Sequence, residues 1–84
     1  MDEKTLRALI EAGAVKRCRI IANGATFHID FETPTGAVTA CTMRKRVKQW
    51  VSLDAASRWL RGLGIGSAQL DLARWVPRQK RLEL

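Results

Sequence analysis

A two-residue turn signal, Asn23-Gly24, stands between two β-type stretches and constrains the fold more than any other feature of the sequence. Glycine adopts the positive φ angles that tight hairpins need, and Asn-Gly is the strongest short hairpin signal. Residues 15–22 precede it, and residues 26–32 follow it with strict alternation of apolar and polar side chains. The apolar positions of the second stretch are Phe27, Ile29 and Phe31. The sequence therefore predicts an antiparallel hairpin with one apolar and one polar face.

Two helices and two further strands are predicted around this hairpin. Residues 5–14 and 52–63 have apolar side chains at the three- and four-residue spacing of an amphipathic helix, and Ser52 is a favourable N-cap. Residues 37–43 continue as a third strand, and residues 70–72 alternate as a short last strand. The predicted class is α+β: a short N-terminal helix, a three- to four-stranded antiparallel sheet (a β-meander), one amphipathic helix packed on it and a short final strand.

A chain of 84 residues has room for a single small domain with a thin core. The residues expected to form that core are Phe27, Ile29, Phe31, Leu53, Ala56, Leu60 and Leu63. Residues 77–84 are expected to form a flexible basic tail. A small sheet also leaves unpaired edges, so we expect the protein to form a homodimer through a sheet edge or an apolar surface.

Positive charge dominates the chain and is concentrated in few places. Fifteen Lys and Arg residues against eight Asp and Glu residues give a net charge of +7. Residues 44–51 and 14–25 carry basic residues and no acidic ones. Such clusters bind anionic partners, nucleic-acid phosphates above all. The predicted nucleic-acid-binding residues are Arg44, Lys45, Arg46, Lys48, Arg17 and Arg19.

The basic run 44–48 has two possible conformations: it extends the third strand, or it forms another strand after a bend. In a strand, Arg44, Arg46 and Lys48 would share one face and Lys45 would lie on the other. The trio could then follow a phosphate backbone.

The sequence offers little for catalysis, metals or membranes. His28, Asp30 and Glu32 lie on one predicted strand face, but a polar outer face explains them better than a catalytic or metal site. Cys18 and Cys41 form no disulfide framework, and buried strand cysteines are commoner than reactive ones. We expect a cytoplasmic protein with free thiols that is no enzyme and binds no cofactor, metal or membrane.

The segment 51–65 resembles small plasmid proteins described as partition-associated accessories. Its alanine- and leucine-containing helix ends in Leu63-Gly64-Ile65, and a short strand, residues 69–72, follows. Residues 6–13 are similar to the same group, whereas the run 44–48 is more basic than expected there. The resemblance implies an accessory role in DNA maintenance on a plasmid or mobile element, and it assigns no site residues.

These observations favour a small basic nucleic-acid-binding protein, with DNA a better candidate than RNA. The alternative is a protein-interaction module that docks a partner or a second copy through a strand edge or through the surfaces of Trp50 and Trp75. A third interpretation is an inhibitor of an acidic partner. Tryptophans beside the basic cluster would favour nucleic acid, and tryptophans in a separate apolar patch would favour a protein.

Overall fold

The predicted hairpin forms the centre of the sheet in the computed structural model, which describes residues 1–76; the predicted tail, 77–84, lies outside the described residues. Strand β1 (Arg17–Asn23) pairs antiparallel with β2 (Thr26–Thr33). The register sets Ile20 opposite Ile29, so the apolar positions of both strands share one face. The alternation in the sequence therefore determined which face of the hairpin is buried.

The turn itself is one residue later than the sequence signal suggests. Asn23 is still paired with Thr26, so Gly24 and Ala25 are the two turn residues. Gly24 has a φ of 66°, and Ala25 has no positive φ. A turn that needs a positive φ only at its first central position suits glycine followed by an ordinary residue.

Two more strands complete a mixed four-stranded sheet in the order β3-β2-β1-β4. Strand β3 (Gly36–Thr39) is antiparallel to β2, as predicted. Strand β4 (Gln69–Asp71) instead runs parallel to β1, so the prediction of an antiparallel sheet is wrong for this strand. The reason is the helical connection before β4, which carries the chain back across the sheet and allows parallel pairing.

Both helices begin at side-chain caps. Helix α1 (Glu3–Glu11) starts two residues earlier than predicted, because the Asp2 carboxylate accepts a hydrogen bond from the Thr5 backbone N–H at 2.9 Å. Helix α2 (Leu53–Gly62) begins after Ser52, as predicted. The Ser52 hydroxyl accepts a hydrogen bond from the Ala55 N–H at 3.1 Å.

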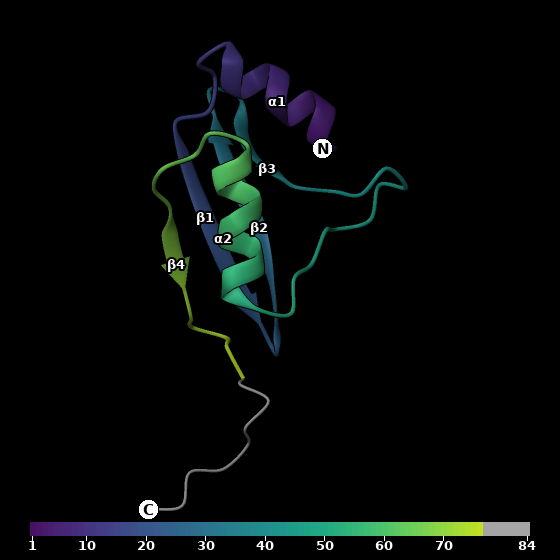
Figure 1. Cartoon of the computed structure of the whole chain (residues 1–84), viewed down its shortest axis with the longest axis vertical. Helices are drawn as coiled ribbons and strands as arrows, with labels where there is room; N and C mark the ends of the chain where they lie inside the picture. The colour runs from purple at the N-terminus through teal and green to yellow at the C-terminus, as the bar shows by residue number, and fades with distance from the viewer. Residues whose placement is uncertain (77–84) are drawn as a thin grey trace, which may run out of the picture.

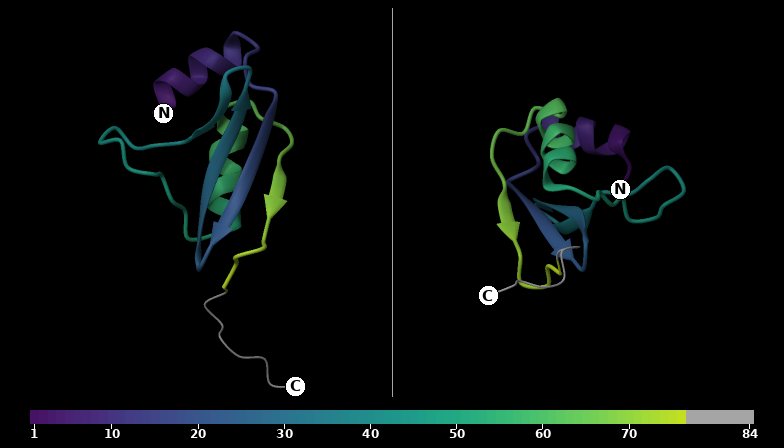
Figure 2. Two further views of the ribbon diagram at one scale, coloured as in Figure 1. Left: turned by 180° about the vertical axis from the view of Figure 1, so that it is seen from behind. Right: turned by 60° about the horizontal axis from the view of Figure 1, so that its bottom comes forward.

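The helices lie on the same side of the sheet (Figures 1 and 2). Six of the seven predicted core residues are buried: Phe27, Ile29, Phe31, Ala56, Leu60 and Leu63. Leu53 is the exception at 37% exposure, because it faces an open groove beside β4. Leu6 of α1 is fully buried and was not predicted in the core. The described residues contain no helix long and apolar enough to cross a membrane.

Candidate nucleic-acid interface

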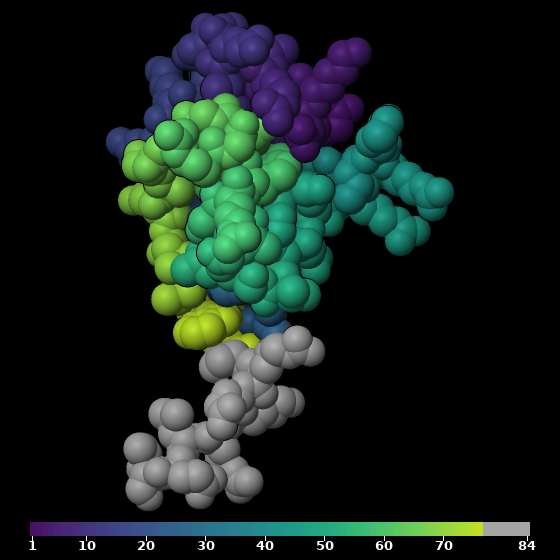
Figure 3. Space-filling model, viewed as in Figure 1, coloured from purple at the N-terminus to yellow at the C-terminus, as the bar shows by residue number. Residues whose placement is uncertain are grey.

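The basic run projects from the domain as a small hairpin, which we call the basic hairpin and define as residues 40–48. The Lys48 N–H donates to the Ala40 carbonyl at 2.9 Å, and Cys41 forms a bridge with Val47. Between β3 and α2, this arm extends well beyond the body of the molecule (Figures 1 and 3). Of the two conformations left open for this run, extension of the third strand is therefore wrong, because the chain bends in the middle of the run and forms isolated bridges after the bend.

The chain rejoins the sheet immediately after this excursion. Trp50 and Phe27 exchange two backbone hydrogen bonds, of 2.8 and 2.9 Å, at the edge of β2. Both ends of the basic hairpin are thus fixed to the same strand, since the Ala40 N–H donates to the Ile29 carbonyl at 2.9 Å. Backbone hydrogen bonds therefore attach the basic hairpin to the edge of β2 near both of its ends.

Thr42 orders the tip of the basic hairpin. Its hydroxyl accepts hydrogen bonds from the backbone N–H groups of Arg44 and Arg46, each at 3.3 Å. Its backbone N–H donates to the Arg46 carbonyl at 2.7 Å, and its carbonyl accepts from the Lys45 N–H at 2.9 Å. Lys45 turns the chain with a φ of 64°, a left-handed conformation that is uncommon outside glycine. The tip is therefore a hydrogen-bonded turn.

Three cations meet at this tip. Arg44, Lys45 and Arg46 are all exposed, and Met43 beside them is 92% exposed. Among the ion pairs of residues 1–76, none involves a side chain of the basic hairpin. Unneutralised cations on a projecting turn can approach an anionic surface without first breaking internal pairs.

Lys48 lies apart from these three residues, at the base of the arm. Its ammonium group is 5.5 Å from the ring centroid of Trp50 and 5.9 Å from that of Trp59, within the range of cation–π attraction. The two tryptophan rings are 5.0 Å apart. The Trp59 indole N–H also donates to Glu3 at 3.0 Å, and this bond lowers the pKa of the Glu3 carboxyl. Lys48 thus belongs to a cluster that joins the arm to both helices.

Arg17 and Arg19 lie on the outer face of the sheet, which neither α1 nor α2 covers (Figure 2). The register pairs Arg17 with Glu32 and Arg19 with Asp30, and the Arg19 guanidinium lies 3.7 Å from Glu32. This face therefore carries charges of both signs and is no basic patch. The structure brings together three of the six predicted binding residues, and it places the other three elsewhere.

The predicted polar face of β2 is engaged in local contacts. Asp30 accepts a hydrogen bond from the Thr39 hydroxyl at 2.7 Å, and His28 lies 3.9 Å from the same carboxylate. In the described part of the chain, no three His, Cys, Asp or Glu side chains are grouped as metal ligands. Asp30 thus ties β2 to β3 across the outer face.

Sequence reasoning missed the part that Thr42 plays. A threonine shortly before a basic run is a signal for a side-chain-capped turn, since its hydroxyl can accept backbone N–H groups two residues on. That signal competed with the high β propensity of Val38, Thr39 and Thr42, which favoured one long strand. The turn is preferred because the tip then satisfies its own backbone donors.

The buried cysteine, Cys18, gives a prediction about the pH dependence of stability. Cys18 is 5% exposed, and burial raises the pKa of its thiol from 9.0 to about 11. Between these values the folded state holds a proton that the unfolded state has lost, so the free energy of unfolding should decrease as the pH rises from 9 to 11. Urea unfolding at pH 8 and pH 10.5 measures this decrease.

The Cys18→Ala variant is the control for that measurement, because it removes the titrating thiol and retains the other groups that titrate in this range. Its decrease between pH 8 and pH 10.5 should be smaller than that of the parent chain. Equal decreases in both proteins would show that the Cys18 thiol is not responsible.

A scan against protein-family models gives no match to this chain, and searches of curated proteins and of solved structures give no significant match.

Proposed function

We propose that this chain is a small, basic, non-enzymatic nucleic-acid-binding protein and that the tip of the basic hairpin contacts phosphates. The observation that carries the proposal is the arrangement of Arg44, Lys45 and Arg46 on a projecting, hydrogen-bonded turn. Guanidinium and ammonium groups bind phosphate oxygens well, and arginine does so with two parallel hydrogen bonds. The hairpin carries no carboxylate or imidazole for acid–base chemistry, which supports binding as its role.

The shape of the arm favours duplex DNA over duplex RNA. The major groove of B-DNA is about 12 Å wide and admits a two-stranded β-ribbon. The major groove of A-form RNA is deep and too narrow for side chains to read. A two-stranded arm with cations at its turn therefore suits the DNA groove and its flanking phosphates.

Two further observations support a role on DNA. Trp50 and Trp59 lie at the base of the basic hairpin beside Lys48, as expected of a nucleic-acid-binding protein, whereas Trp75 lies in a separate apolar hollow, as expected of a protein-interaction module. The resemblance of residues 51–65 to partition-associated accessories supports an accessory role on a plasmid or mobile element.

Binding to random-sequence duplex DNA, measured by fluorescence anisotropy over a series of salt concentrations, tests the proposal. Each phosphate neutralised contributes a slope of about −0.9 to the plot of log K against log salt. Three tip cations should therefore give a slope of about −3, and binding should be strong at low salt and weak at high salt.

Duplex RNA of the same sequence and length serves as the matched control. We expect it to bind more weakly than DNA at every salt concentration. Absence of measurable DNA binding at low salt would refute the proposed function, and tighter binding to the RNA duplex would refute the choice of DNA.

A further inference from the structure

Large apolar side chains gather at a surface around β4 and the start of α2. Most large apolar residues that are exposed among residues 1–76 belong to this group: Val51, Leu53, Leu70, Leu72, Trp75 and Val76. The first five line a single hollow of about 290 Å³ beside β4. Contiguous exposed apolar surface on a small domain commonly marks an interaction site.

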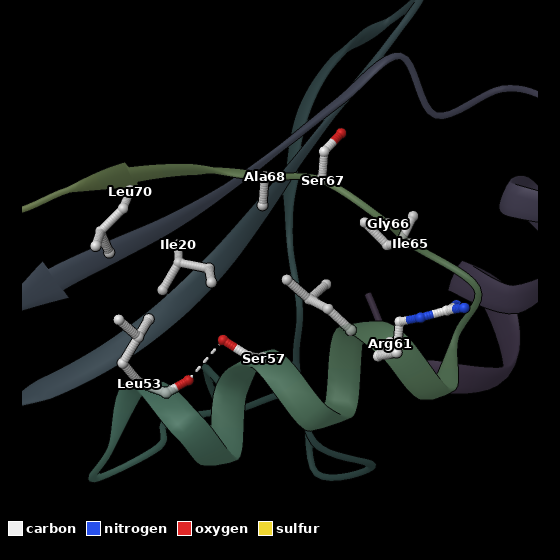
Figure 4. A pocket seen from close by; sticks show the side chains of 10 residues that line it. Ile20, Leu53, Ser57, Arg61, Ile65, Gly66, Ser67, Ala68 and Leu70 are labelled. Carbon is white, nitrogen blue, oxygen red and sulfur yellow. Dashed lines mark hydrogen bonds between the residues drawn. The ribbon is translucent and has the colours of Figure 1, made fainter.

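This hollow continues into a second one between α2 and β4, with a volume of about 400 Å³. Leu53 and Leu70 line both hollows, and Ile20 and Ala68 also point into the second (Figure 4). We call the two hollows together the β4 groove. The groove exists because α2 packs against β2, which leaves the apolar face of β4 without a covering layer.

The charge around the β4 groove differs from place to place. A further hollow, which shares Leu70 and Leu72 with the groove, is lined by Arg19 and Asp71 and so carries charges of both signs. No residue that lines the two hollows of the groove itself is acidic, and Arg61 stands at the end near Gly66 (Figure 4). Beyond that end, two further hollows share Ser67 with the groove and are lined by Lys16 and by Arg17, the residue that is paired with Glu32 across the hairpin. The surface therefore combines an apolar floor with a basic end.

The backbone of β4 adds a third feature. This strand is an edge of the sheet, so one side of it has no neighbouring strand within the described residues. An extended peptide can pair with such an edge and place alternate side chains in pockets beside it. The pairing would be short, because after Asp71 the chain bends: the Ala73 N–H donates to the Asp71 carboxylate at 2.9 Å. Side chains in the groove must then supply most of the affinity.

We propose that the β4 groove binds an extended segment of a partner protein, with alternate apolar side chains on the groove floor and acidic side chains at the end near Arg61. This binding is separate from the contact of the basic hairpin with nucleic acid and does not depend on it. Of the classes considered from the sequence, it corresponds to the protein-interaction module that docks a partner through a strand edge or the surface of Trp75.

A second copy of this chain is a poorer occupant than an acidic partner. The chain has a net charge of +7, so two copies repel each other. Among residues 1–76 its acidic side chains are largely engaged, as in the pairs Arg58–Asp54 at 3.1 Å and Arg7–Glu3 at 3.2 Å. A second copy therefore offers few free carboxylates to the basic end of the groove.

Two synthetic peptides test the proposal with the full chain. One carries three leucines at alternate positions followed by three glutamates, and the other has the reverse order, because the groove does not fix the direction of the bound strand. Trp75 lines the groove, so binding should change the tryptophan fluorescence. We expect at least one peptide to bind in a salt-sensitive manner, and a scrambled peptide of the same composition to bind at least about tenfold more weakly, equivalent to about 1.4 kcal/mol.

Three variants locate the binding. Leu72→Ser removes an exposed groove side chain and Arg61→Gln removes the cation, and each should weaken peptide binding about tenfold. Arg44→Gln changes a residue of the basic hairpin and should leave peptide binding unchanged. Circular dichroism confirms that all three variants are folded, and retained DNA binding is the second control for Leu72→Ser and Arg61→Gln.

Three results would overturn the proposal. The first is the absence of binding by either peptide at millimolar concentration. The second is equal affinity of the parent chain and the Leu72→Ser and Arg61→Gln variants. The third is a dimer of the parent chain, seen by sedimentation, that the Leu72→Ser variant does not form, because a second copy would then occupy the groove. A failure of DNA binding alone would refute the proposed function and leave the groove intact.

Discussion

Replacing Arg44, Lys45 and Arg46 together with glutamine should reduce the salt dependence of DNA binding by two to three units of slope. Each of these side chains is exposed and forms no ion pair with any residue of the described range 1–76, so each is expected to neutralise about one phosphate. At low salt the loss in affinity should be on the order of a hundredfold. The variant should fold normally, because exposed charges contribute little to stability and the tip hydrogen bonds involve Thr42 and backbone groups.

A second triple variant, Lys16→Gln with Arg17→Gln and Arg19→Gln, is the matched control. It removes the same number of charges from the β1 side, where Arg19 lies close to Glu32. The slope should change much less than in the hairpin variant. If the control variant lost the salt dependence and the hairpin variant kept it, the contact would lie on β1.

The Phe31→Ala variant should lose a large part of its stability. Phe31 is fully buried in β2 and lies against Trp59, with ring centroids 6.3 Å apart. Truncating a buried phenylalanine to alanine costs about 3–5 kcal/mol, because apolar contacts are lost and a cavity remains. Since a small domain has a net stability of about 5–15 kcal/mol, urea unfolding followed by circular dichroism should show a much lower midpoint.

The Val51→Ala variant provides the comparison, because Val51 is 70% exposed. Its free energy of unfolding should stay within about 0.5 kcal/mol of that of the parent chain. Similar midpoints for the two variants would mean that β2 and α2 do not enclose the core described above.

The sequence predicted the positive charge of the candidate site, but it did not predict its conformation. The run 44–48 stood out because four cations occur in five positions. Its conformation depended on Thr42, whose hydroxyl holds the turn, and on Trp50, which returns the chain to β2. Lys48 lies apart from the tip because it packs on Trp50 and Trp59. These two tryptophans are nine residues apart in the sequence.

The sequence by itself determined the local structure of this protein. Alternation fixed the buried face of β2, and Ser52 fixed the start of α2, because these features depend on residues only a few positions apart.

Only the tertiary structure decided the features that join distant segments. They include the parallel direction of β4, the projection of the basic hairpin and the exposure of Leu53. Each depends on where α2 packs on the sheet and on which strand edge the chain pairs with after the basic hairpin and after α2. Local patterns carry little information about such choices, because packing between segments far apart in the chain overrides their weak local preferences.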